Sequence, residues 1–95
     1  MKWVEIIVLR SAGSNRKLLE SELTKLIAQA DKKNERPEIM VYSRVLIDTD
    51  FSIQIINDSD KVENSGSQLG LCLVSALKEF GLVNHSIWIE MPYDP

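Results

Sequence analysis

Hydrophobic and polar residues alternate with two different periods along this chain. A period of two, which sends successive side chains to opposite faces of a strand, covers residues 3–9, 38–47, 51–57 and 82–91. A period of 3.6, which gathers apolar residues on one helical face, covers a segment after residue 15 and the segment 65–80. The pattern therefore predicts the order strand, helix, strand, strand, helix, strand.

The second predicted helix is the least polar one, and we expect it to form the centre of the core. Its apolar face is Leu69, Leu73, Ala76, Leu77 and Phe80, widened by Leu71, Cys72 and Val74. Ser65 and Gln68 have the spacing of a capping box at its start, and Gly81 offers a left-handed residue to end it. Because Cys72 lies among apolar neighbours, we expect a buried, inert thiol.

The first helix and the central hairpin have weaker but recognisable patterns. The apolar stripe of the helix is Leu18, Leu19, Leu23, Leu26, Ile27 and Ala30. The strands 38–47 and 51–57 are separated by Asp48-Thr49-Asp50-Phe51, which has the composition of a turn. We therefore predict a hairpin whose turn lies at residues 48–51.

This order of elements within 95 residues is the split pattern of a ferredoxin-like βαββαβ sandwich. Right-handed crossovers place both helices on one face of a four-stranded antiparallel sheet with the spatial strand order 4-1-3-2. We predict an α+β fold in which residues 1–91 form a single ferredoxin-like domain and residues 92–95 an extended C-terminal tail. The other face of the sheet then has no helix to cover it.

The alternation assigns both tryptophans to that uncovered face. Its predicted residues are Trp3, Glu5, Ile7 and Leu9; Met40, Tyr42, Arg44 and Leu46; Gln54 and Ile56; and Asn84, Ser86, Trp88 and Glu90. Large exposed apolar patches mark interaction sites, so we expect a partner or a ligand here. We predict that the interface or ligand site on this face consists of Trp3, Glu5, Tyr42, Arg44, Gln54, Trp88 and Glu90. An acid–base role of the two glutamates beside the tryptophans competes with salt bridges to Arg44.

Composition narrows the class of partner. The net charge of -3, with basic residues scattered among acids, argues against nucleic acid and anionic membranes. Ser52 and Gln54 also stand where an RNA-recognition sheet needs aromatic residues. The apolar run 4–9 is broken by Glu5 and is too short to span a bilayer. We expect a cytoplasmic protein whose small core favours self-association.

No sequence motif identifies a catalytic centre, a cofactor or a metal site. His85 is the only histidine, and it has no cysteine or carboxylate partner nearby in the sequence. Arg10 and Gly13 precede the first helix as in the anion loop of acylphosphatases, but the rest of that motif is missing, which favours an ordinary turn. The acidic pairs and triplets lack the glycine and terminal glutamate of a calcium loop: Asp48 and Asp50, and Asp58, Asp60 and Glu63.

In topology and length, residues 2–91 resemble the dimeric ferredoxin-like α/β-barrel proteins, a superfamily that includes antibiotic-biosynthesis-type monooxygenases and many small bacterial proteins of unknown role. The resemblance implies a homodimer associating through the open sheet face. Haem-degrading members use an Asn, a His and a Trp, but Asn84 and His85 are adjacent in one strand and point to opposite faces, so that chemistry is not carried over. Our hypothesis is a homodimer that binds a small hydrophobic or aromatic ligand. The alternatives are a monooxygenase-like enzyme and a regulatory or ligand-sensing module.

Overall fold

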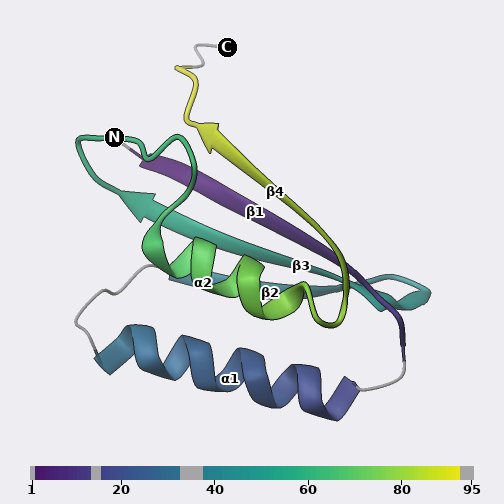
Figure 1. Ribbon diagram of the computed structural model, residues 1–95. Coiled ribbons are helices and arrows are strands. Elements are labelled where there is room, and N and C mark those ends of the chain that lie inside the picture. The colour runs from purple at the N-terminus through teal and green to yellow at the C-terminus, as the bar shows by residue number, and fades with distance from the viewer. Residues whose placement is uncertain (1, 14–15, 33–37, 93–95) are drawn as a thin grey trace.

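Six elements form in the predicted order. The computed structural model describes residues 2–13, 16–32 and 38–92, so the predicted tail lies mostly outside the described residues. The strands and helices are β1 (Lys2–Ser11), α1 (Arg16–Lys32), β2 (Glu38–Arg44), β3 (Ile47–Asp58), α2 (Gln68–Leu77) and β4 (Gly81–Ile89) (Figure 1). The predicted βαββαβ arrangement is confirmed.

The four strands form one antiparallel sheet with the order β2-β3-β1-β4, which is the predicted 4-1-3-2 read from the other edge. β1 and β3 are central, and Ile7 of β1 has Ile53 and His85 as its partners on either side. Both helices lie on one side of the sheet, and no helix of the described residues lies on its other side (Figure 1). The protein is therefore an α+β sandwich of ferredoxin-like topology.

The core lies between this sheet and the two helices. Its buried apolar residues are Ile7, Leu9, Leu19, Leu23, Phe51, Ile53, Ile55, Leu73 and Leu77. The helix periodicity thus predicted the inner faces of both helices. It made them too wide, since Leu18 on α1 and Leu71 on α2 are exposed, and Cys72 is exposed rather than buried. The side chain of Ala30, the last residue of the predicted stripe on α1, lies outside the described residues.

The prediction for the two faces of β1 was wrong. Trp3, Ile7 and Leu9 are buried on the helix side, and the alternate residues Val4, Ile6 and Val8 lie on the open side. Directly paired residues share a face of a sheet, and Ile7 is paired with Ile53 and Leu9 with Phe51, both in the core. A central strand that is apolar on both faces leaves its orientation undecided until its register with β3 is known.

The hairpin also turns at a different place from the predicted one. β2 ends at Arg44 and β3 begins at Ile47, so the turn is Val45–Leu46, with Leu46 at a left-handed φ of 65°. The pairing passes from Ser43 with Phe51 directly to Arg44 with Ile47, which leaves residues 48–50 as a bulge within β3. The turn composition of residues 48–51 therefore marks a bulge rather than a chain reversal.

Both predicted ends of α2 need correction. The N-cap is Ser67, whose Oγ accepts a hydrogen bond of 3.0 Å from Gly70 N, and Ser65 lies in the preceding loop. The C-cap is Lys78 in a right-handed conformation. Gly81 does not have a positive φ and instead begins β4 where two strands approach closely, because a Cβ there would lie 2.0 Å from the carbonyl oxygen of Arg10.

Candidate functional site

The structure separates the seven residues predicted to form one site. Tyr42, Gln54 and Trp88 lie on the open side of the sheet, as predicted. Trp3 and Glu5 lie on the helix side of the sheet, where they are 3% and 0% exposed, so their predicted place on the open face was wrong. The other two residues lie at the ends of strands. Arg44 is the last residue of β2, and Glu90 follows β4 and donates its backbone N–H to Lys2 O.

The strand register defines an uncharged surface on the open side, which we call the open face. It consists of Val4, Ile6, Val8, Met40, Tyr42, Ser52, Gln54, Ile56, Leu82, Asn84, Ser86 and Trp88. Three of its large side chains are exposed to solvent: Leu82 is 75%, Trp88 57% and Tyr42 47% exposed. Val4, Ile6 and Val8 were missed by the sequence analysis because β1 was assigned the wrong way round.

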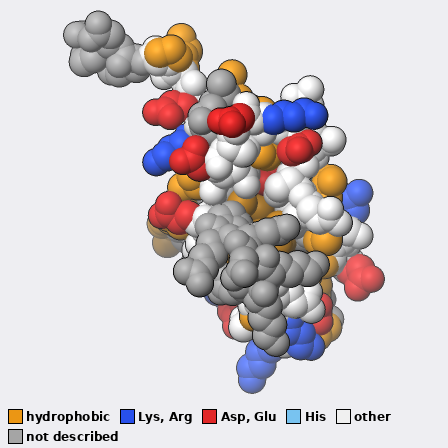
Figure 2. Space-filling model, turned by 90° about the vertical axis from the view of Figure 1, so that its left-hand side faces the viewer, with side chains coloured by type: hydrophobic (Ala, Val, Ile, Leu, Met, Phe, Trp, Pro, Cys, Tyr) orange, Lys and Arg blue, Asp and Glu red, His pale blue; other side chains and the backbone are white. Residues whose placement is uncertain are grey.

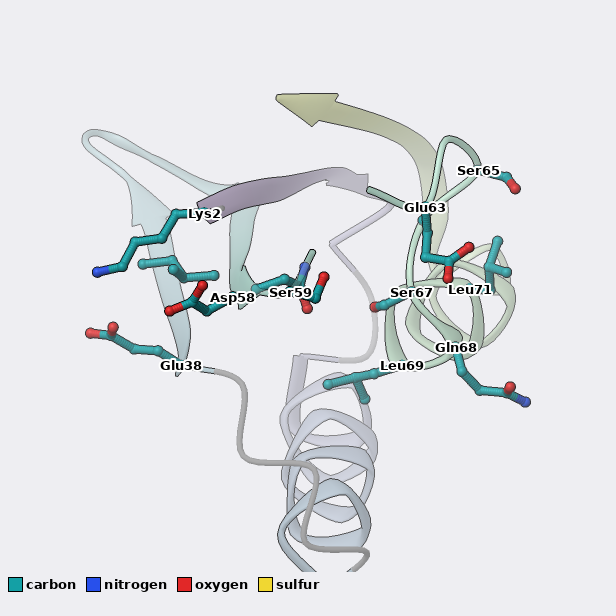
Figure 3. A pocket seen from close by; sticks show the side chains of 13 residues that line it. Lys2, Glu38, Asp58, Ser59, Glu63, Ser65, Ser67, Gln68, Leu69 and Leu71 are labelled. Carbon is teal, nitrogen blue, oxygen red and sulfur yellow. The ribbon is translucent and has the colours of Figure 1, made fainter. Parts of the chain in front are cut away.

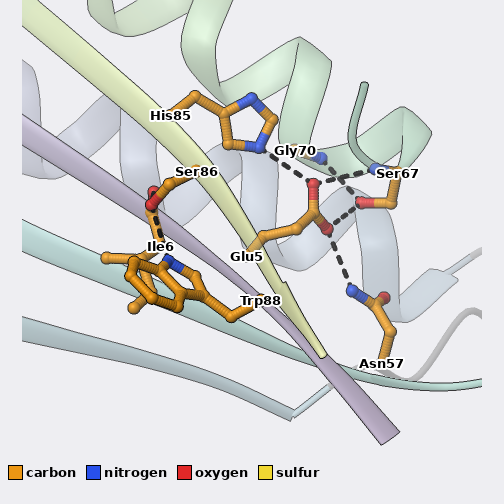
Figure 4. A network of polar contacts seen from close by, with 8 residues as sticks. All are labelled: Glu5, Ile6, Asn57, Ser67, Gly70, His85, Ser86 and Trp88. Atoms are coloured by element: carbon orange, nitrogen blue, oxygen red, sulfur yellow. Dashed lines mark hydrogen bonds and ion pairs between the residues drawn. The ribbon is translucent and has the colours of Figure 1, made fainter. Parts of the chain in front are cut away.

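The polar groups of the open face are already partly bonded within the chain. Trp88 Nε1 donates to Ser86 Oγ at 2.8 Å, and Ser86 Oγ donates to Ile6 O at 3.4 Å (Figure 4). The Tyr42 hydroxyl donates to the sulfur of Met40 at 3.2 Å. A partner that covers Trp88 would therefore bury an indole whose N–H keeps its hydrogen bond.

Glu5 occupies a polar site of its own beneath the sheet (Figure 4). Its Oε1 accepts a hydrogen bond of 2.8 Å from Ser67 N and lies 3.1 Å from His85 Nε2. Its Oε2 accepts hydrogen bonds from Ser67 Oγ and from Asn57 Nδ2, the latter at 3.0 Å. A carboxylate at the first turn of a helix is also favoured by the helix dipole. Glu5 thus connects β1 to β3, β4 and the start of α2.

Two glycines leave the space for this carboxylate. A Cβ on Gly70 would lie 2.1 Å from Glu5 Oε1, and one on Gly66 would lie 2.4 Å from His85 Cε1. Gly66 also has a φ of 102°, which other residues adopt only with strain. The glycines on either side of the capping serine were the sequence signal for this site. The site is a fully bonded structural connection, whereas the sequence analysis placed Glu5 on the open face with either a salt bridge to Arg44 or an acid–base role.

A hollow of about 780 Å³ opens where β3 ends and α2 begins (Figure 3). Asn57 and Ser67 of the Glu5 site line it, together with the acidic residues Glu38, Asp58 and Glu63 and with Lys2. Acidic and basic side chains are mixed over this end of the molecule (Figure 2). Among the residues with a described position, no group of three or more His, Cys, Asp or Glu side chains could hold a metal ion.

The topology and the open face define the class of protein: a ferredoxin-like α+β domain with an uncovered sheet. No protein-family model, curated protein or solved structure matches the chain. Neither described helix is long and apolar enough to cross a membrane.

Proposed function

We propose that this protein is a cytoplasmic homodimer and acts as an association module, with the open face of each copy packed on that of the other. The observation that carries the proposal is the uncharged open face with its exposed large side chains, above all Trp88 and Tyr42. Such a face on a single copy leaves apolar area in water that association would remove. This is the assembly expected from the topological resemblance to dimeric ferredoxin-like α/β-barrel proteins.

The size of the open face suits a dimer. Four strands about 4.8 Å apart and about nine residues long, at about 3.3 Å per residue, span roughly 600 Å² in projection. A stable interface buries about 800 Å² of accessible surface per partner, which a corrugated surface of that projected area supplies. Two sheets packed face to face at about 10 Å are also a standard layer arrangement.

The distribution of charge supports a second copy as the occupant. In a two-fold interface, residues near the axis meet their own counterparts, so a charged residue there would face a like charge. The middle of the open face contains Ile6, Val8 and Gln54, which carry no charge. The charged residues of the same strand faces lie at the strand ends, for example Lys2 and Arg10 of β1.

The burial and hydrogen bonding of Glu5 and its contact with His85 also favour an association module over an enzyme. Glu5 has no exposed surface and accepts from three hydrogen-bond donors, with His85 as a further contact. A general acid or base must reach the proton that it transfers, either directly or through one water. The Glu5 carboxylate is instead bonded to Ser67 at the start of α2, and His85 is in contact with that carboxylate.

Sedimentation velocity over a range of protein concentrations tests the proposal. The test variant is Val8→Glu, in the middle of the open face, and the matched control is Leu18→Glu on the outer side of α1; the two parent side chains are 37% and 53% exposed. We expect a wild-type dimer, an unchanged dimer for Leu18→Glu, and a dissociation constant for Val8→Glu raised by about 100-fold or more, because two like charges would be desolvated together. Far-ultraviolet circular dichroism checks that both variants are folded.

A wild-type protein that stays monomeric at about 100 μM would overturn the proposal, since an interface of this size is expected to associate at lower concentration. A folded Val8→Glu variant with the wild-type dissociation constant would also overturn it, because the dimer would then use another surface.

A further inference from the structure

β4 forms one edge of the sheet, and nothing in the described part of the chain pairs with its outer side (Figure 1). It is paired with β1 over its whole length, from Gly81 opposite Ser11 to Ile89 opposite Trp3, without a register shift. An edge strand presents a row of unpaired backbone N–H and C=O groups, to which another strand can bind. The outer edge of β4 is therefore a candidate interaction surface.

The hydrogen bonds at the two ends of β4 show which of its backbone groups point outward. Ala12 N donates to Phe80 O at 2.9 Å at one end, and Glu90 N donates to Lys2 O at 3.2 Å at the other. In an antiparallel pair, every second residue bonds to the same neighbouring strand, so the even-numbered residues of β4 direct their N–H and C=O groups to β1. The residues that direct these groups outward are Gly81, Val83, His85, Ile87 and Ile89.

β4 lacks the features that protect edge strands from pairing. Those features are charged side chains, prolines, bulges and short length. Gly81–Ile89 contains no Asp, Glu, Lys, Arg or Pro, and its pairing with β1 has no bulge. The opposite edge strand, β2, is shorter, has Glu38 and Arg44 at its ends, and has a register shift in its pairing with β3. Of the two edges of the sheet, β4 is therefore the one suited to bind another strand.

Apolar side chains flank the outer edge of β4 on both sides of the sheet. Leu82 and Trp88, which are 75% and 57% exposed, lie on the open side, and Ile89, which is 61% exposed, lies on the helix side. A strand added at this edge needs apolar side chains in both directions to cover them, and a charged side chain would be desolvated there. β4 itself has that composition, so a second copy of this strand is the partner that the chain supplies.

Two copies of β4 can pair through a two-fold axis perpendicular to the sheet. An axis at Ser86 places Val83 opposite Ile89 and His85 opposite Ile87 of the other copy, so that these residues exchange roughly eight backbone hydrogen bonds. An axis at His85 would instead place two imidazoles side by side and leave Ile89 opposite a glycine. With the axis at Ser86, the helices of both copies lie on one side of the joined sheet and the two open faces on the other.

We infer that the outer edge of β4 binds β4 of a second copy in antiparallel orientation about Ser86, which joins the two sheets into one of eight strands, four from each copy. This contact goes beyond the proposed open-face homodimer, because it uses a different surface and leaves both open faces available. A strip about 30 Å long and about 10 Å thick spans roughly 300 Å², compared with roughly 600 Å² for the open face. The edge contact is therefore the weaker of the two and joins open-face dimers at higher protein concentration.

Disulfide trapping tests the edge contact separately from the open-face dimer. All variants carry Cys72→Ser, because the native thiol is exposed, and Val8→Glu, which removes the open-face contact. In the inferred register, the two copies of residue 86 form a non-hydrogen-bonded pair with Cα atoms about 4.5 Å apart, which a disulfide can bridge. Under mild oxidation at millimolar protein concentration, we expect most Ser86→Cys chains to become disulfide-linked dimers.

Asn84→Cys is the matched control, because it lies on the same face of the same strand but opposite Trp88 in this register. Its two copies would be about 13 Å apart at about 3.3 Å per residue, which is too far for a disulfide. We expect its linked yield to be less than about a tenth of that of Ser86→Cys. Far-ultraviolet circular dichroism of the reduced variants checks that both are folded.

The outcomes separate the edge contact from the proposed function. Equal yields from Ser86→Cys and Asn84→Cys, whether high or low, would overturn the edge contact. If the wild type also forms a dimer that Val8→Glu dissociates, the open-face homodimer would stand without it. Preferential linkage of Ser86→Cys in a protein whose wild type shows no open-face dimer in sedimentation would support the edge contact and overturn the proposed function.

Discussion

Replacing Glu5 by glutamine tests whether the buried carboxylate holds α2 on the sheet. Glu5→Gln keeps the shape of the side chain and changes only its charge and one acceptor. In the wild type, the carboxylate accepts from Ser67 N, Ser67 Oγ and Asn57 Nδ2, and His85 Nε2 lies within hydrogen-bond distance. The variant turns charge-assisted bonds into neutral ones and directs an amide NH₂ towards groups that also donate.

The magnitude follows from the number of contacts. Hydrogen bonds to a charged group contribute about 1 kcal/mol more than neutral ones, and a buried donor left unsatisfied costs about 1–3 kcal/mol. Four contacts of this kind, partly relieved by rotation of the Asn57 amide, give an expected loss of about 2–4 kcal/mol. A chain of this length has a free energy of unfolding of about 5–14 kcal/mol, so the loss would be a large fraction of it.

Urea unfolding followed by tryptophan fluorescence measures this loss, because the buried Trp3 becomes exposed to water on unfolding. All variants are compared at one protein concentration, because dimerisation would add to the apparent stability. The control is Glu90→Gln, the same chemical change at an exposed residue, for which we expect a change within about 0.5 kcal/mol. If the two variants have free energies of unfolding within about 0.5 kcal/mol of each other, the Glu5 contacts do not stabilise the fold as argued.

Two further substitutions test the glycine beside Glu5 and the strained turn. Gly70→Ala should destabilise the fold by about 2 kcal/mol or more, although alanine is favoured over glycine in a helix by about 1 kcal/mol, because its Cβ would lie 2.1 Å from Glu5 Oε1. Urea unfolding against Ser75→Ala, an exposed residue of the same helix, measures this, and equal stability would contradict the packing. Leu46→Gly should raise the free energy of unfolding of the monomeric Val8→Glu background by up to about 1 kcal/mol, since relief of about 1–2 kcal/mol of backbone strain exceeds the entropic cost of glycine. Urea unfolding measures this change, and a lower free energy of unfolding for the glycine variant would contradict the strain at Leu46.

The sequence by itself determined the elements and their arrangement in space. Alternation with period two and with period 3.6 depends on local geometry, so the four strands and two helices could be predicted from their own residues. The strand order followed because right-handed crossovers in a βαββαβ chain leave few topologies. The inner residues Leu73 and Leu77 of α2 were predicted correctly for the same reason, and the alternation that assigns Gln54 and Ile56 to the open side leaves Ile53 and Ile55 in the core, where they lie.

Only the tertiary structure decided which way β1 faces, and with it the nature of the site. Both faces of β1 are apolar, so a shift of one residue in its register with β3 would exchange them without changing the sequence pattern. The observed register buries Trp3 and Glu5 and brings Val4, Ile6 and Val8 to the open face. The donors for Glu5 come from three other elements far along the chain, which local periodicity does not relate to one another.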